Sequence, residues 1–393
     1  MRQVFLSEIT ARLESGSRPA GGATSVDGIP SLGGEHLSDD GGFRLEKLKY
    51  VPADFYENLR AGKIERDDIL IVKDGATTGR VCFVDENFPL DAAAVNEHVF
   101  RLAIDESRAV PKYVFYFLHS GIGKKLLLSD FRGATVGGIS RGFINLAKVP
   151  LPSLDEQRRI VSILDRGDAL RHRCDIIASD YAKLQSALVE NVSSTATANT
   201  RLGDLAEVSS GITKGRKTAE ATRELPYLAV SNVQAGYLDM TLVKTIAATQ
   251  KEIERYALRA GDVLMTEGGD PDKLGRGTVW RDELPLCLHQ NHVFKVRVND
   301  TNVLHPEFLG AYLGSRAAKD YFLRSAKQTT GIATINMTQL KNLPVPDLSN
   351  SDQLQFISQL DAIREQQKHN RIFAARLDSL FMALQSNAFS GRL

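Results

Sequence analysis

The chain has 393 residues, of which 42% are hydrophobic and 25% charged, an ordinary globular composition with enough length for two or three domains. The formal net charge is +1, so a site for a polyanion would have to come from local placement of cations. No apolar run reaches the length of a membrane span, and the N-terminus lacks a signal-peptide core. Cys82, Cys174 and Cys287 are solitary and form no CxxC motif or disulfide framework, which predicts a cytoplasmic protein without a membrane or metal site.

Residues 1–152 predict a domain of mixed α and β structure. Short apolar or alternating stretches predict strands at 68–72, 81–84 and 95–104. Pro111 is expected to open a buried helix, and a second short helix is expected at 123–131. A glycine-containing loop, residues 73–80, separates the first two strands.

A long helix is predicted over residues 153–192. Ser153 is a suitable N-cap, and Glu156 completes a capping box. Apolar or small residues then recur at alternating steps of three and four, the pattern of a coiled-coil seam. The seam is predicted at Ile160, Ile163, Leu170, Ile177, Leu184 and Leu188, with Gly167, Cys174 and Tyr181 between them. A helix of about 35 residues would be roughly 50 Å long and needs a partner to cover this seam.

Residues 193–200 form a Ser/Thr/Ala-rich linker, and the chain beyond it repeats the first half at an offset near 195 residues. His98-Val99-Phe100 matches His292-Val293-Phe294, and Val149-Pro150-Leu151-Pro152 matches Leu343-Pro344-Val345-Pro346. The shared order of such matches predicts a duplicated domain over 201–346. Its strands are expected at 262–265 and 292–298, its helices from Pro306 and Ser315, and its glycine-containing loop at 267–276.

A second long helix is predicted over residues 347–393. Its seam is predicted at Phe356, Leu360, Ile363, Leu377, Phe381 and Leu384, with a polar middle at Gln367 and Asn370. Because the prolines before each long helix also match, we expect the two helices to pair. The predicted fold class is α+β, with two tandem mixed domains each followed by a long helix.

No catalytic motif is found in the sequence. There is no GxSxG elbow, no HExxH motif, no amino-methyltransferase motif and no glycine-rich cofactor fingerprint. Gly211 to Thr218 fails the phosphate-binding P-loop spacing by one residue, and a basic turn is the better interpretation. His98 and His292 occupy equivalent positions without neighbours that would complete a metal site. Each is expected to be a packed or hydrogen-bonding strand residue, with contact to a nucleic-acid base as the alternative. The chain is therefore expected to be non-catalytic and to bind no cofactor itself.

Polar loop residues of the kinds that contact DNA remain. Arg and Lys neutralise phosphate, Arg reads guanine, and Asn or Gln reads adenine. The candidates in the first domain are Arg18, His36, Lys73, Thr77, Thr78, Arg80, Asn96, Arg132 and Arg141. Those in the second are Lys214, Arg216, Lys217, Asn232, Lys273, Arg276, Asn291, Gln328 and Thr329. The alternative for any of them is an ordinary solvated residue, and for Arg80 and Arg276 a pairing with Asp74 or Asp272.

The run from Pro150 to Ile160 resembles the "PLP-x-L-x-EQ-x-x-I" signature of the specificity subunits of type I restriction–modification systems. The second copy departs from it, with Ser351-Asp352-Gln353 in place of the acidic-Glu-Gln run and Phe356 in place of Ile. The stretches at Gly138-Ile139 and Gly331-Ile332 are also similar to the family pattern.

The resemblance implies two target recognition domains, each reading one half of a bipartite site in double-stranded DNA. The long helices would pair as an antiparallel coiled coil that sets the spacing. They would also dock two copies of a methyltransferase subunit, which supplies S-adenosylmethionine and the catalytic residues, and a restriction translocase subunit would complete the assembly. Two other interpretations stay open on the sequence: a self-contained enzyme of another class, and a non-catalytic protein-binding scaffold with two tandem heads.

Overall fold

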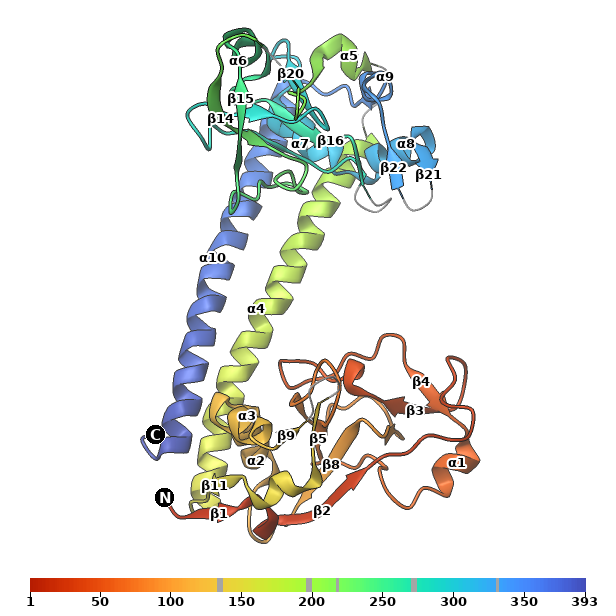
Figure 1. The fold of residues 1–393 in the computed structure, drawn as a ribbon, viewed down its shortest axis with the longest axis vertical. Helices are drawn as coiled ribbons and strands as arrows, with labels where there is room; N and C mark the ends of the chain where they lie inside the picture. The colour runs from red at the N-terminus through yellow and green to blue at the C-terminus, as the bar shows by residue number, and fades with distance from the viewer. Residues whose placement is uncertain (133–136, 196–199, 217–218, 270–273, 330–331) are drawn as a thin grey trace. The chain divides into compact units, whose positions relative to one another are not determined.

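The structure is a computed structural model that describes residues 1–132, 137–195, 200–216, 219–269, 274–329 and 332–393. The chain divides into two compact units (Figure 1). Unit 1 contains residues 1–175 and 372–393, and unit 2 contains residues 176–371. Two long helices, α4 (Leu154–Thr195) and α10 (Asn350–Ser390), each contribute residues to both units.

Within the described residues, unit 1 is built on a four-stranded antiparallel sheet. Its strand order is β2 (Thr10–Ser15), β8 (Val99–Ile104), β5 (Ile69–Val72), β6 (Val81–Phe83). A three-stranded sheet has the order β4 (Lys49–Val51), β3 (Ile29–Leu32), β7 (Ala94–Val95). Two strand pairs join β1 (Gln3–Phe5) with β11 (Lys148–Pro150) and β9 (Phe131–Arg132) with β10 (Gly138–Ile139). The helices are α1 (Ala53–Glu57), α2 (Pro111–His119) and α3 (Gly121–Leu128).

Unit 2 repeats this topology in its described residues. The four-stranded sheet has the order β13 (Ala206–Ser210), β20 (Val293–Val298), β16 (Val263–Thr266), β18 (Gly277–Val279). The three-stranded sheet has the order β15 (Lys244–Ala248), β14 (Arg223–Leu228), β19 (Leu288–His289). Smaller sheets join β12 (Thr200–Arg201) with β23 (Pro344–Val345), and β17 (Gly268–Gly269) with β22 (Ile332–Thr334) and β21 (Lys327–Thr329). The helices are α5 (Leu202–Leu205), α6 (Gln250–Tyr256), α7 (Pro306–Leu313), α8 (Arg316–Ser325) and α9 (Met337–Lys341).

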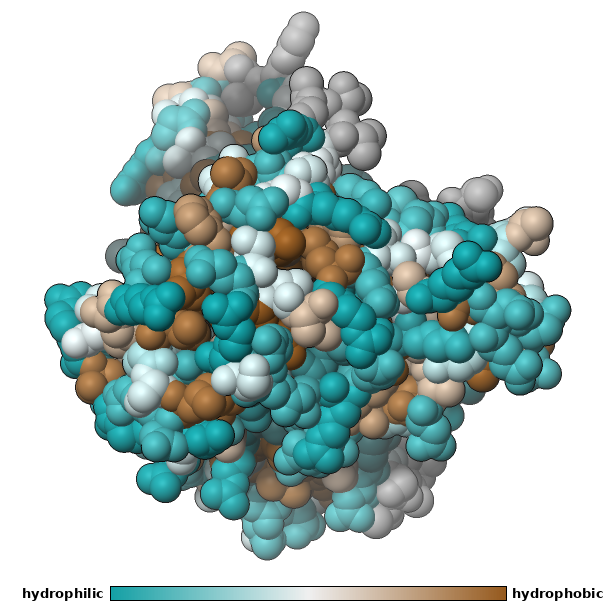
Figure 2. Space-filling model, turned by 90° about the horizontal axis from the view of Figure 1, so that it is seen from below, coloured by the Kyte–Doolittle hydropathy of each residue, from teal (hydrophilic) through white to brown (hydrophobic). Residues whose placement is uncertain are grey.

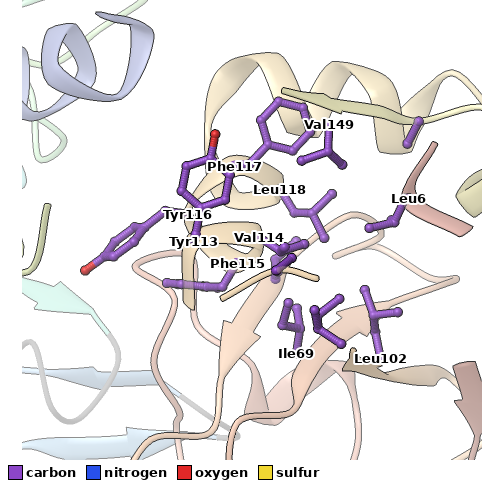
Figure 3. Close-up of a cluster of buried hydrophobic side chains, with 14 of the residues drawn as sticks. Leu6, Ile69, Leu102, Tyr113, Val114, Phe115, Tyr116, Phe117, Leu118 and Val149 are labelled. Atoms are coloured by element: carbon purple, nitrogen blue, oxygen red, sulfur yellow. The ribbon is translucent and has the colours of Figure 1, made fainter. Parts of the chain in front are cut away.

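The central strand β5 is apolar throughout because both faces of its sheet are covered. Ile69 and Leu102 face the buried helix α2 (Figure 3), and Ile71 belongs to the same core cluster. Leu70 and Val72 face the opposite way, into a cluster under the three-stranded sheet. An uninterrupted apolar run is what a doubly covered strand requires. Unit 2 divides in the same way: Val263 and Met265 pack with α7, and Leu264 packs with Trp280.

A buried glutamine locks the start of each long helix to the preceding domain. Gln157 accepts a hydrogen bond from Val110 N at 2.8 Å and donates to Pro152 O at 2.9 Å. Gln353 accepts from His305 N at 2.8 Å and donates to Leu348 O at 3.1 Å. The second copy departs from the EQ pattern at Asp352, but it keeps the glutamine that makes these bonds.

Replacing either buried glutamine by alanine should lower the free energy of unfolding by about 1–3 kcal/mol, because a part-buried N–H and a part-buried carbonyl lose their partners. Gln355→Ala is the matched control, since Gln355 lies exposed on the same helix. Urea unfolding followed by circular dichroism measures the difference. Equal stability of Gln353→Ala and Gln355→Ala would contradict the role of the glutamine.

Within each unit, the segments of the two long helices pack together and run antiparallel, which confirms that part of the predicted fold (Figure 1). In unit 1, Ile160 and Leu164 near the start of α4 share a core with Phe381 and Phe389 near the end of α10. In unit 2, Val189 near the end of α4 shares a core with Phe356 and Leu360 near the start of α10. The helix α4 extends to Thr195, so residues 193–195 of the predicted linker are helical.

Burial divides the predicted seam. On α10, Phe356, Leu360, Ile363 and Phe381 are buried. On α4, the predicted Cys174 is buried but Leu170, Ile177 and Leu184 are exposed, and Leu164, which was not predicted, is buried. In unit 1 the seam position beside Leu170 is taken by Arg171, whose guanidinium lies 4.7 Å from the Phe381 ring centroid and pairs with Asp378 at 2.7 Å. The long side chain of Arg171 covers apolar surface while its charge is paired, a role that an apolar pattern does not predict.

On the face drawn in Figure 2, hydrophobic residues form scattered patches among hydrophilic ones. Among the described helices, none is long and apolar enough to cross a membrane.

Candidate nucleic-acid interface

The same three segments meet in each unit. In unit 1, Lys73 begins the glycine-containing loop after β5, and its N–H donates to His98 O in the turn before β8, at 2.9 Å. Ile139 N of β10 donates to Lys73 O at 2.7 Å. In unit 2, Glu267 N bonds His292 O at 3.0 Å, and Ile335 N bonds Glu267 O at 2.9 Å. We call these described segments the loop cluster of each unit: residues 73–80, 97–98 and 138–139 in unit 1, and residues 267–269, 274–276, 291–292 and 332–335 in unit 2.

Each loop cluster carries an imidazole held by a carboxylate. The distance from His98 Nδ1 to Asp74 Oδ1 is 2.5 Å, and that from His292 Nδ1 to Glu267 Oε2 is 2.6 Å. The sequence analysis identified both histidines as equivalent and predicted a packed or hydrogen-bonding strand residue at each, with base contact only as the alternative. Their carboxylate partners were missed because they lie 24 and 25 positions away along the chain.

Further charges surround His98 in unit 1. Arg18 pairs with Glu97 at 2.7 Å, and Glu97 Oε1 lies 3.4 Å from His98 Nε2. Lys73 lies 3.7 Å from Asp74. The structure thus brings the predicted residues Arg18 and Lys73 together around one histidine.

Three predicted DNA contacts have a structural role instead, because their side chains are buried. His36 is 1% exposed, and its Nδ1 accepts a hydrogen bond from Gly33 N at 2.9 Å. Asn96 accepts from His98 N at 2.9 Å and so shapes the turn before β8. Asn232 accepts from Ala229 N at 2.9 Å and donates to Asp239 O at 2.8 Å. In each case the side chain forms its hydrogen bonds with nearby backbone groups. The residue type alone does not reveal these bonds.

Two predicted arginines are held in ion pairs. Arg80 pairs with Asp39 at 2.6 Å, not with Asp74, and its hydrogen bonds lower the pKa of Asp39. Arg216 pairs with Glu252 at the start of α6 and donates to Ala247 O at 2.7 Å. The hydrogen bond from Arg216 lowers the pKa of Glu252 to about 2.

The remaining candidates in unit 1 lie on or near its loop cluster. Thr77 and Thr78 donate to Gly34 O and Gly75 O within or beside the loop. Arg132 is exposed on β9 and lies 3.1 Å from Asp130, and Arg141 is exposed after β10. Arg132, Arg141 and Arg18 are thus exposed predicted cations of unit 1.

In unit 2, Lys214 is exposed and lines a cleft of about 650 Å³ with Arg216 and Glu224. Arg276 donates to Gln234 at 2.9 Å, and Asn291 Nδ2 lies 3.3 Å from His292 Nε2. Lys217 and Lys273 lie outside the described residues. Gln328 and Thr329 have a described backbone in β21, but their side chains are not described.

The fold and the loop clusters define a duplicated protein, with one polar loop cluster in each of two related units that share a pair of long helices. The family model described as "Type I restriction modification DNA specificity domain" matches residues 51–175 and 197–373. The chain therefore belongs to this family, which confirms the resemblance seen in the sequence.

Named relatives agree with this assignment. The chain is 24% identical over 396 residues to the type I restriction enzyme StySPI specificity subunit of Salmonella potsdam, covering 93% of this chain and 83% of that protein. It is 24% identical over 310 residues to the EcoKI specificity subunit of Escherichia coli K12, covering 72% of this chain and 65% of that protein.

Two solved structures share the fold. One is from work on complex assembly and conformational transition of the type I R-M system, with a TM-score of 0.62, 16% identity, and coverage of 100% of this chain and 98% of that one. The other is the type I restriction–modification S subunit from M. genitalium, with a TM-score of 0.55, 13% identity, and coverage of 99% and 96%.

Proposed function

We propose that this chain is the DNA-specificity subunit of a type I restriction–modification complex, and that each unit reads one half of a bipartite site in double-stranded DNA. The observation that carries the proposal is the repetition of one loop cluster in both units of a chain whose family is defined by a DNA specificity domain. Two related readers in one chain suit two half-sites, since each half-site needs its own set of base contacts.

The paired helices have two functions in this proposal. They set the separation of the half-sites, because α4 and α10 are continuous over 42 and 41 residues. They also dock two methyltransferase subunits, which bring S-adenosylmethionine and the catalytic residues, and a restriction translocase subunit joins that assembly. The exposed apolar residues on α4 and α10 support docking, since such side chains are buried favourably by a partner; they include Leu170, Ile177, Leu184, Phe373 and Leu380.

The charge of the chain supports a shared DNA interface. A net charge of +1 leaves little cation excess for a duplex, and many exposed cations are already paired. The methyltransferase subunits would supply much of the phosphate neutralisation, so the chain alone should bind DNA weakly. We also place the protein in the cytoplasm, where its three buried free cysteines would stay reduced.

Salt dependence tests the proposal. The chain assembled with its cognate methyltransferase should bind duplex DNA with an affinity that falls roughly 10³- to 10⁵-fold between 50 and 200 mM salt, as expected for several phosphate contacts. Fluorescence anisotropy with a labelled duplex measures this slope. A slope near zero would contradict DNA binding and favour a protein-binding scaffold.

A further inference from the structure

A histidine–carboxylate pair is present in both units, although a different residue supplies the carboxylate in each. His98 and His292 are equivalent, as are Lys73 and Glu267, because the same backbone hydrogen bonds connect them. Yet the carboxylate in unit 1 comes from Asp74, one position after Lys73, whereas in unit 2 it comes from Glu267 itself. Two different side chains thus reach the same imidazole nitrogen.

The histidine–carboxylate pair contributes little to the stability of either unit. The side chains of His98 and Asp74 are 44% and 28% exposed, and those of His292 and Glu267 are 57% and 34% exposed. Ion pairs between side chains this exposed contribute little to stability, because solvent screens their charges. What the carboxylate does fix is the direction of the ring, because it accepts the Nδ1 hydrogen and leaves Nε2 to other neighbours. These neighbours are Glu97 Oε1 at 3.4 Å in unit 1 and Asn291 Nδ2 at 3.3 Å in unit 2.

The surroundings of Nε2 favour a base edge over a phosphate. Asp74 and Glu97 flank His98, and each lies beside a cation, Lys73 at 3.7 Å and Arg18 at 2.7 Å. Glu97 Oε2 is buried without a hydrogen-bond partner among the described residues and can accept from a base amino group. In unit 2, Nε2 lies 3.3 Å from the amide of Asn291, beside Glu267. Carboxylates repel phosphate but accept hydrogen bonds from the amino groups of cytosine and adenine in the major groove.

We propose that His98 and His292 are specificity-determining residues, each contacting a base edge in one half-site, with Asp74 and Glu267 as their positioning residues. This inference rests on the proposed function of the two units. It assigns one base-pair position in each half-site to a histidine.

The test uses the chain with its cognate methyltransferase and reads the methylated sequence motif. His98→Ala should relax the base preference at one position of one half-site by roughly 5- to 150-fold, and His292→Ala should do so in the other half-site only. Arg66→Ala is the control, because Arg66 is exposed and lies outside the loop cluster. Thermal unfolding of each variant checks that the fold is retained.

A rescue variant tests the positioning role. Asp74→Gly removes the carboxylate and should relax the same position as His98→Ala. Lys73→Glu combined with Asp74→Gly recreates the Glu267-Gly268 arrangement of unit 2 and should restore the preference. A carboxylate needed only for stability would give no such recovery of the motif.

The outcomes distinguish failure of the proposed function from failure of the inference about the histidines. If the unaltered chain directs no motif, the proposed function fails. If it directs a motif that His98→Ala leaves unchanged, the inference fails while the proposed function stands. Uniformly weaker methylation of every sequence, with no relaxed position, would show a phosphate contact and would also overturn the inference.

Discussion

Inserting seven residues into both α4 and α10 should lengthen the unread spacer between the half-sites by about three base pairs. Seven residues add about 10.5 Å of helix, and a base pair rises about 3.4 Å. The insertions belong after Asp175 and after Arg371, where each helix passes from one unit to the other. A full heptad in both helices keeps the seam in register on either side.

Both half-site sequences should stay the same in this variant, because neither loop cluster is altered. Sequencing of methylated DNA from cells that carry the variant and the cognate methyltransferase measures both properties. A three-residue insertion in α4 alone is the matched control, and it should abolish assembly because it rotates one seam away from the other. An unchanged spacer after the double insertion would contradict the proposed ruler.

Replacing the recognition part of unit 1, residues 1–150, with that of another family member should change one half-site completely and leave the other intact. The reason is that each unit has its own core and its own loop cluster. The helix α2 also packs on the end of α10, where the rings of Tyr113 and Phe389 lie 5.5 Å apart. Tyr116 and Phe381 lie 6.3 Å apart at the same interface.

The exchange therefore needs two versions. One keeps Tyr113, Tyr116 and Phe117 of α2 and should assemble normally, and the other takes these positions from the donor and should be less stable. Methylation mapping of both versions gives the half-sites. A change in both half-sites would mean that the units do not read independently.

Much of the fold could be predicted from the sequence because its signals are local or repeated. Strands β5 and β16, helices α2 and α7 and both long helices lie where the patterns place them. Each sequence match between the two copies is weak by itself. Together the matches are informative, because they occur in the same order and at a nearly constant offset.

The middle of the α4 seam could not be predicted, because Arg171 is placed there by Asp378 and Phe381, more than 200 residues away. The same limit applies to the candidate site. His36, Asn96 and Asn232 have side chains suited to DNA contact, but nearby backbone groups satisfy and bury them. The pairs at His98 and His292 depend on loop geometry that joins positions far apart in sequence.

Methylation mapping tests most directly whether two units read two half-sites. The chain is expressed with its cognate methyltransferase in a methylation-free host, and modified bases are read across the genome. We predict a single motif of two short sequences separated by an unread spacer of fixed length. A soluble complex that gives no motif would contradict DNA reading by this chain and leave it as a scaffold that docks the methyltransferase without directing it.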